Sequence, residues 1–240
     1  MQRRRAASSL NVLRCVSETQ RVVVLAALLV RAEFVVRFAE SPSCFMTAKT
    51  KTLLRKELRA ARRAHVDAQP DSVTALLFNH PPRPILKAIP DSAIIGLYRA
   101  GRYEAPTAGY ARFFHERGHP IALPRFANDA APMGFARHTD PFDESDLVPG
   151  PFRLTQPAAQ AAALVPDIVF APLIGFTASG QRLGQGGGHY DRWLAEHPGR
   201  VAVGLAWDIQ RIEPDAMLQA EPHDIALDAV VTPTRIYGDL

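Results

Sequence analysis

Cysteine is nearly absent from this 240-residue chain, and its two cysteines, Cys15 and Cys44, both lie within the first 45 residues. Residues 46–240 contain none. A disulfide framework and a thiolate-bound metal are therefore excluded from that part of the chain. The scarcity is typical of proteins kept in a reducing compartment, and we expect a cytoplasmic protein.

Long apolar runs are missing as well. The run VVVLAALLV at 22–30 has nine residues, whereas a membrane-spanning helix needs about 20. It does not fit a secretory signal, because Arg3–Arg5 lie far upstream and no A-x-A cleavage site follows. An organelle transit peptide is the alternative for this Arg-rich segment, although its three Glu argue against it. We expect no membrane association.

A basic excess is absent from the main part of the chain. Residues 1–45 hold seven Arg and three Glu, which account for the whole net charge of +4. Residues 46–240 are electrically balanced, so a nucleic-acid-binding function loses its main support. Met46 opens a second plausible start. We therefore expect residues 1–45 to be an N-terminal extension outside the fold and residues 46–240 to form a single domain.

Short apolar segments alternate with helical patterns along the main part of the chain. This alternation predicts an α/β protein with three layers, α/β/α, and a mostly parallel sheet covered on both faces. The expected strands are residues 93–98, 121–123, 167–171, 201–206 and 225–231, and the expected helices are 47–65, 107–117 and 190–196.

Glycine is concentrated in RLGQGGGHYDRWL, residues 182–194, between a buried strand and an amphipathic helix. A flexible linker does not fit that position, so tight turns or a close approach to a ligand remain. A glycine loop at a helix N-terminus presents N–H groups to an anion, most often phosphate. The spacing is neither a dinucleotide fingerprint, because His189 replaces its third glycine, nor a Walker A loop. Spacing alone leaves phosphate binding and a structural turn open.

The segment RLGQGGGHYD resembles the signature R-L-G-x-G-x-G-x-Y-D of the 5-formyltetrahydrofolate cyclo-ligase family, also called 5,10-methenyltetrahydrofolate synthetase. The resemblance extends over about residues 48–237 and implies a sheet architecture like that of sugar-phosphate isomerases and CoA transferases. The other similar segments, in chain order, are KTLLR (51–55), YRAGRYEAPT (98–107), LPRF (123–126), PDIVFAPLIGF (166–176) and EPHDIALDAVVT (221–232).

The resemblance implies an ATP-dependent ligase (EC 6.3.3.2) that cyclises 5-formyltetrahydrofolate to 5,10-methenyltetrahydrofolate, with ADP and phosphate as the other products. The expected partners are the small-molecule substrates, a reduced folate and ATP, with Mg²⁺ as cofactor, and the protein is expected to be a monomer. Two rivals stay open: an enzyme of another class on the same architecture, and a non-enzymatic folate- or nucleotide-binding module.

The resemblance also assigns roles to residues, without a catalytic residue among them. The ATP-binding residues are Lys51, Arg55, Arg182, Leu183, Gly184, Gln185, Gly186, Gly187, Gly188, His189 and Tyr190. The folate-binding residues are Arg99, Glu104, Gln185, Gly186, Gly187, Gly188 and His189. The Mg²⁺ ligands are Asp191 and Asp228.

Other interpretations of these residues remain open at this point. Lys51 and Arg55 fit a solvated basic stripe, which is how we interpret Lys56, Arg59, Arg62 and Arg63 of the same segment. Asp191 fits a carboxylate that interacts with a helix N-terminus, and Asp228 fits a strand-end turn. Many family members carry basic side chains at the positions of Gln185 and Gly187, so backbone N–H groups must contribute more here. Arg125 and residues 133–135 fit either the folate pocket or packing.

Overall fold

The computed structural model describes residues 50–74, 76–238 and 240. The chain divides into two units, Met1–Met46 and Thr47–Leu240. The first unit lies outside the described residues, so the expected role of residues 1–45 stays a prediction. Within the part of the chain that the structure describes, no helix combines the length and the apolar character that a membrane crossing needs.

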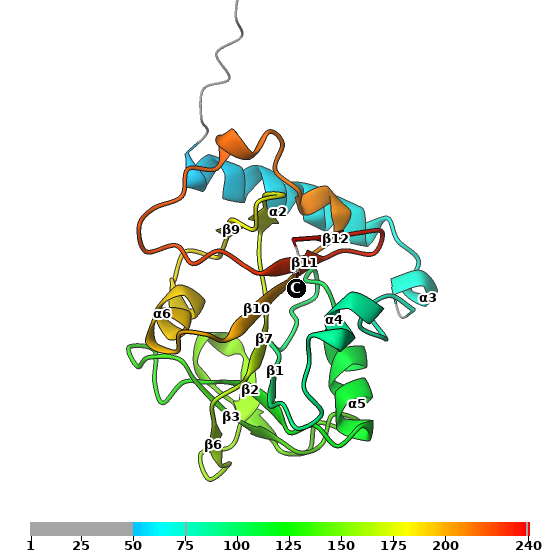
Figure 1. Ribbon diagram of the computed structural model, residues 1–240, viewed down its shortest axis with the longest axis vertical. Helices are drawn as coiled ribbons and strands as arrows, with labels where there is room; N and C mark the ends of the chain where they lie inside the picture. The colour runs from blue at the N-terminus through cyan, green and yellow to red at the C-terminus, as the bar shows by residue number, and fades with distance from the viewer. Residues whose placement is uncertain (1–49, 75, 239) are drawn as a thin grey trace, which may run out of the picture. The chain divides into compact units, whose positions relative to one another are not determined.

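An eight-stranded sheet forms the centre of the fold, with the order β12-β11-β10-β7-β1-β2-β3-β6 (Figure 1). The five central strands are parallel, whereas β12, β3 and β6 join antiparallel at the two edges. This confirms the predicted α/β class. The bounds are β1 Ile95–Gly96, β2 Ile121–Arg125, β3 Gly134–His138, β6 Ala163–Leu164, β7 Ile168–Ala171, β10 Val201–Leu205, β11 Ala229–Val231 and β12 Ile236–Tyr237.

Among the residues that the structure describes, two short hairpins and three 3₁₀ turns extend the loops that follow the strands. The hairpins pair β4 (Leu147–Pro149) with β5 (Thr155–Pro157), and β8 (Gly175–Phe176) with β9 (Arg182–Leu183). The 3₁₀ turns are η2 (Pro151–Arg153), η3 (Asp208–Gln210) and η4 (Asp215–Met217).

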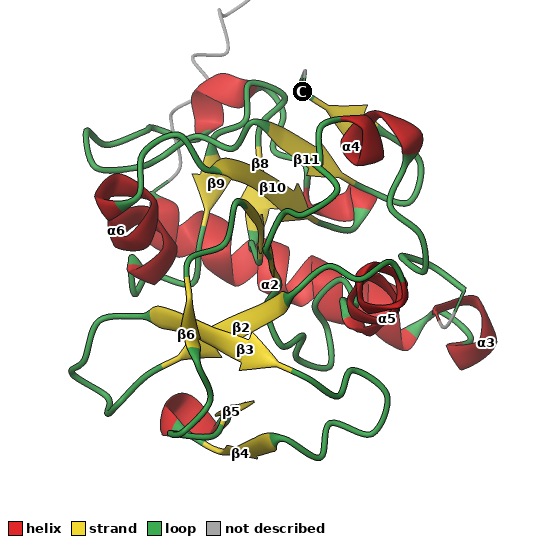
Figure 2. Cartoon of the chain, turned by 60° about the horizontal axis from the view of Figure 1, so that its bottom comes forward, coloured by secondary structure: helices red, strands yellow, loops and turns green. Residues whose placement is uncertain are grey.

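Alternation along the buried strands divides the core between the two faces of the sheet. In β7, Ile168 and Phe170 join a cluster with the helices α4 and α5, while Val169 and Ala171 join a cluster with α6. Figure 2 shows α5 and α6 on opposite sides of the strands, as a three-layer arrangement requires. The helices are α2 Lys51–Asp67, α3 Asp71–Thr74, α4 Arg83–Lys87, α5 Ala108–Glu116 and α6 His189–Glu196.

The helix α2 lies across the end of the sheet where β7 finishes (Figure 1). Leu54 is buried against Ile174 and Leu183, both of which follow β7 in the chain. The helix is capped by Thr50, whose hydroxyl accepts a hydrogen bond from Leu53 N at 3.3 Å. α2 therefore reaches the same edge of the sheet as the glycine loop.

The last parallel strand is shorter than the sequence predicts, because β11 begins at Ala229 rather than at residue 225. The backbone just before it bonds elsewhere: Leu227 N donates to Gly180 O at 2.9 Å, and Ile225 N donates to the Asp191 carboxylate at 3.3 Å. Residues 225–227 thus run beside the turn of the β8–β9 hairpin and the start of α6 before the chain enters the sheet.

Gln210 joins two of the segments that emerge from the sheet. Its side chain is almost fully buried, donates to Leu173 O and Ile174 O at 2.8 and 3.1 Å, and accepts from Trp207 N at 2.8 Å. The change Gln210→Met keeps the volume but removes these bonds. We expect it to lower the free energy of unfolding by about 3 kcal/mol in urea denaturation, because buried polar groups lose their partners.

The matched control is Gln219→Met, since Gln219 is exposed. We expect this variant to change the free energy of unfolding by less than about 0.5 kcal/mol. Equal stabilities for the two variants would remove Gln210 from the interactions that hold the segments together.

Candidate functional site

A cleft with a volume of about 470 Å³ opens at the carboxyl ends of β1, β2 and β7. Tyr98 and Arg99 line it after β1, Pro124 at the end of β2 and Pro172 after β7, and the segment from β9 into α6 closes another side. The carboxyl edge is where open α/β sheets bind their ligands. The glycine-rich segment therefore faces a cavity rather than bulk solvent alone.

The glycine loop depends on two left-handed glycines. Gly186 has φ 112° and Gly188 has φ 62°, backbone conformations that residues with a Cβ rarely adopt. Gly188 is the residue that precedes α6, so the loop delivers the chain directly to a helix N-terminus. Gly187 lacks a left-handed φ, and its constraint is different: a Cβ there would come within 2.8 Å of the His189 ring.

Two arginines of α2 donate hydrogen bonds to this loop. Arg55 Nε donates to Gly184 O at 2.9 Å, and Arg59 Nη2 donates to the Gln185 side-chain oxygen at 2.8 Å. Arg62, one turn further along, is buried and donates to Leu173 O at 3.2 Å. The interpretation of Arg59 and Arg62 as solvated was wrong, because both lie on the helix face that Arg55 presents to the loop.

Charged groups meet beside the start of α6. Arg182 Nη2 lies 2.6 Å from Asp191 Oδ1, and Lys51 Nζ lies 2.7 Å from Asp224 Oδ2 and 3.0 Å from Glu221 Oε2. Ile225 N also donates to Asp191 Oδ1 at 3.3 Å, so the backbone next to Asp224 lies beside the Asp191 carboxylate. Lys51 and Arg182, both expected to bind nucleotide, are thus each paired with a carboxylate.

Asp224 is ionised at neutral pH. Burial alone would raise the pKa of its carboxyl, but the bonds from Lys51 and from the Glu221 N–H outweigh it and lower the pKa. We did not single out Asp224 from the sequence. The available signal was the acidic residues Glu221 and Asp224 in the segment EPHD, which the family resemblance already included.

Asp228 is not brought to this cluster. It is exposed, it does not line the cleft, and its carboxylate accepts a hydrogen bond from Ala202 N at 2.7 Å. Ala202 pairs with Val169 near the start of β7, at the opposite end of the sheet from the cleft. The structure thus places Asp228 at a strand end, as its alternative interpretation described, whereas the backbone that follows Asp224 bonds to Asp191.

Glu104 lies at the other side of the glycine loop. One carboxylate oxygen accepts from Gly101 N at 2.9 Å, and the other accepts from Gln185 Nε2 at 3.3 Å. Tyr98 and Thr107 fix the shape of this segment: the Tyr98 hydroxyl donates to Ala105 O, and the Thr107 hydroxyl donates to Tyr98 O at 2.6 Å. Glu104 is therefore held in place against the predicted nucleotide loop.

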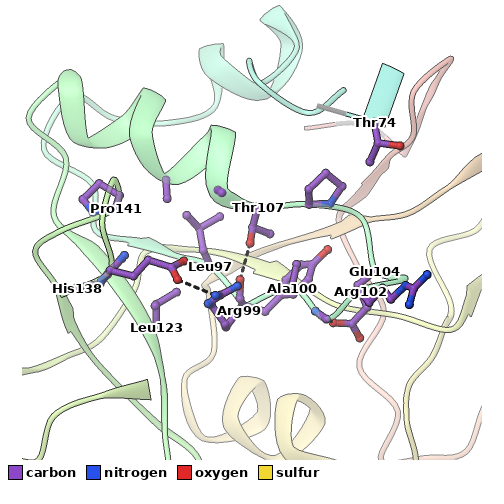
Figure 3. A pocket seen from close by; sticks show the side chains of 16 residues that line it. Thr74, Leu97, Arg99, Ala100, Arg102, Glu104, Thr107, Leu123, His138 and Pro141 are labelled. Carbon is purple, nitrogen blue, oxygen red and sulfur yellow. Dashed lines mark hydrogen bonds and ion pairs between the residues drawn. The ribbon is translucent and has the colours of Figure 1, made fainter. Parts of the chain in front are cut away.

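Arg99 lines both the cleft and a neighbouring cavity of about 210 Å³, shown in Figure 3. Its Nη2 lies 2.6 Å from Glu144 Oε2, so its charge is paired at the boundary between the two. Leu97 and Leu123 give the smaller cavity apolar surface, and His138 lies on the side of Pro141 (Figure 3). Glu144 was not among the residues expected at the site.

Two buried polar groups at the cleft have no hydrogen-bond partner among the described residues: the Tyr190 hydroxyl and Arg182 Nε. Burial, followed by the charge of Glu104, raises the pKa of Tyr190, so its hydroxyl keeps its proton. The pKa of His189 is lowered, first by burial and then by Arg192, which leaves a neutral ring. A polar ligand in the cleft is the obvious partner for the two unpaired donors.

Arg125 and residues 133–135, for which both the folate pocket and packing were open, differ in their surroundings. Met133 lines the cleft. Arg125 Nη1 donates to three backbone carbonyls, of Ala158, Ala159 and Ala161, and Phe135 packs on Trp193 with ring centroids 5.0 Å apart. Arg125 and Phe135 are thus structural.

The fold and the cleft define an α/β protein with a glycine-rich loop at the carboxyl edge of its sheet and ion pairs beside it. The chain belongs to the 5-formyltetrahydrofolate cyclo-ligase family, whose model matches residues 47–233. This confirms the family inferred from the motifs.

Individual relatives share parts of the chain. The 5-formyltetrahydrofolate cyclo-ligase of Escherichia coli strain K12 is 38% identical over 100 residues, 39% of this chain and 53% of its own. That of Mycolicibacterium smegmatis is 33% identical over 128 residues, 50% of this chain and 63% of its own. The chain thus spans between half and two thirds of the length of these two relatives.

Solved structures resemble the fold over more of the chain. The 5,10-methenyltetrahydrofolate synthetase of Aquifex aeolicus superposes with a TM-score of 0.61 at 23% identity, over 78% of this chain and 92% of the other. That of Mycoplasma pneumoniae gives 0.56 at 20% identity, over 76% and 98%. At these identities the likeness establishes the fold.

Proposed function

We propose that this protein catalyses the ATP-dependent cyclisation of 5-formyltetrahydrofolate to 5,10-methenyltetrahydrofolate. The formyl oxygen attacks the γ-phosphorus of ATP and ADP leaves. N10 then attacks the formyl carbon, and the C–O bond breaks with release of phosphate. Phosphorylation turns a poor leaving group into a good one, so the protein must mainly hold its two substrates in line and stabilise charge.

The glycine loop and α2 are suited to the polyphosphate. Gln185, Gly186 and Gly187 are exposed, and Gly188 leads into the positive end of α6. Lys51 and Arg182 add cationic side chains at the same edge. Arg55 and Arg59, because they already bond the loop, act as its supports.

Glu104 and the unpaired donors are suited to the folate. A carboxylate accepts hydrogen bonds from the N–H groups of a pterin ring, and Glu104 is fixed at the border of the cleft. The Tyr190 hydroxyl and Arg182 Nε, both without a partner among the described residues, supply donors for oxygen atoms of either substrate.

Asp191 and Asp224 fit a magnesium ion by their chemistry. One or two carboxylates together with substrate phosphates are what Mg²⁺ usually takes, and Asp191 accepts a hydrogen bond from the residue that follows Asp224. When bound, the ion would neutralise phosphate charge. Without it, Arg182 pairs with Asp191 and Lys51 pairs with Asp224.

One contact carries the proposal: Gln185 Nε2 donates to Glu104 Oε1, and so joins the nucleotide loop to the folate carboxylate across 81 positions of the sequence. A cyclisation that couples the two substrates needs them in one cleft. A small-molecule pair, with no nucleic acid and no membrane, is the proposed set of partners, for a cytoplasmic monomer.

The test is the absorbance of methenyltetrahydrofolate, formed from 5-formyltetrahydrofolate by the purified protein with and without ATP and Mg²⁺. We expect product only when both are present, with one ADP released per product. Binding of both ligands without product would contradict catalysis and favour a non-enzymatic binding module.

A further inference from the structure

The cleft has an apolar side as well as the charged side described above. Phe126, Phe152 and His189 form this side, which we call the aromatic wall: their ring centroids lie 5.0–5.6 Å apart. All three line the cleft. His189 belongs to the glycine loop, so the aromatic wall begins where the predicted phosphate site ends.

Phe152 lies in an unusual backbone conformation. Phe152 and Arg153 both have left-handed φ angles, 59° and 58°, although neither is glycine. Such conformations are costly for bulky residues and persist only where the surroundings impose them, often at ligand sites. The residues around the β4–β5 hairpin therefore fix the position of the Phe152 ring.

Contacts at the base of the β4–β5 hairpin hold Phe152 in this backbone conformation. The Gln156 side chain accepts from Phe126 N and donates to Phe126 O, both at 2.9 Å, which fastens β5 to the end of β2. Gly150 N donates to Leu154 O at 2.8 Å and closes the turn. A Cβ at Gly150 would lie 2.5 Å from Gln156 Cδ, so a larger residue there would displace the side chain that fastens the hairpin.

This construction leaves the Phe152 ring 47% exposed in the cleft. An exposed phenyl ring held by a strained backbone beside two other rings is suited to a flat aromatic group, which would pack on it and remove it from water. Reduced folate has such a group next to N10: its p-aminobenzoyl ring. Because Glu104 is suited to the pterin, the aromatic wall is left for the other ring.

We propose that Phe152, with Phe126 and His189, binds the p-aminobenzoyl ring of the folate and thereby sets the affinity for this substrate. The inference rests on the proposed function. It adds a specificity-determining residue, Phe152, that lies outside the motifs that carry the family resemblance.

The test compares Phe152→Asn with wild type in the full chain. Asn tolerates the left-handed backbone, so the variant removes the ring with little change in strain. We expect the KM for 5-formyltetrahydrofolate, and its Kd measured by titration without ATP, to rise about tenfold. The KM for ATP should change less than about twofold, because the phosphate side is untouched.

Three controls sharpen the result. Phe142→Asn removes a phenyl ring that is 50% exposed but lines neither cavity, and it should leave both KM values unchanged. Phe152→Tyr should restore folate affinity. p-Aminobenzoylglutamate should compete with the folate in wild type and lose this ability in Phe152→Asn.

The outcomes separate two failures. A wild type that binds no 5-formyltetrahydrofolate contradicts the proposed function, and this inference with it. If wild type and Phe152→Asn bind 5-formyltetrahydrofolate equally tightly, this inference alone is overturned. Loss of folate affinity with unchanged competition by p-aminobenzoylglutamate overturns the assignment of the ring.

Discussion

Replacing Gly186 with valine is expected to reduce ATP-dependent turnover by about 10³-fold or more. Gly186 has a φ of 112°, a conformation that is costly for a β-branched residue. The loop must therefore change shape, and its N–H groups no longer point toward the bound anion. Removal of one pre-aligned donor from a charged transition state already costs about 10²–10³-fold. The measurement is kcat for methenyltetrahydrofolate formation at saturating substrates.

The fold itself should survive this change. Apart from the Arg55 side chain, at 3.8 Å, nothing would touch a Cβ at Gly186 closely. Gly199 is the matched control: its φ is 80°, a Cβ there meets nothing within 4 Å, and it lies in the exposed turn between α6 and β10. Gly199→Val should show a similar loss of melting temperature with near wild-type turnover. Equal turnover in both variants would refute the anion-binding interpretation of the loop.

The change Asp224→Asn is expected to lower turnover by about 100-fold, with partial recovery at high Mg²⁺. Loss of one carboxylate weakens metal binding, whereas Asn still accepts a bond from Lys51 and so preserves the contact with α2. Asp191→Asn should behave similarly in a Mg²⁺ titration of turnover. It also leaves the buried Arg182 without its counter-charge, so its melting temperature should fall further.

Asp228→Asn tests directly whether Asp228 is a Mg²⁺ ligand. Its amide oxygen can still accept the bond from Ala202 N, and we expect turnover within about twofold of wild type at every Mg²⁺ concentration. A large, magnesium-dependent loss in Asp228→Asn, with none in Asp224→Asn, would return the metal site to the residue named from the sequence.

Asp224 and Asp228 show which parts of the site could be predicted from the sequence and which could not. The motif segments identified the family and the glycine loop, and alternation of apolar segments predicted the sheet. Four positions separate Asp224 from Asp228, and no periodicity says where an extended segment stops running along a loop and enters a sheet. The start of the strand is decided by the hydrogen bonds of Ile225 to Asp191 and of Leu227 to Gly180. These partners are far away in the sequence.

Arg59 and Phe152 mark two further limits. The spacing of Arg55, Arg59 and Arg62 placed them on neighbouring parts of one helix face, but only the docking of α2 turns that face toward the loop. For Phe152 no local signal exists, because a left-handed conformation in a phenylalanine comes from tertiary contacts and opposes its own preference.

The position of α2 has a consequence for synthesis of the protein. Its contacts with Leu173, Gly184 and Asp224 join residues 111, 129 and 173 positions apart. On the ribosome α2 emerges before the segments that it contacts, and Leu54 stays unburied until almost the whole chain has been made. The support of the glycine loop by α2 is therefore completed late, and a nascent chain that stops before residue 224 lacks the ion pair between Lys51 and Asp224.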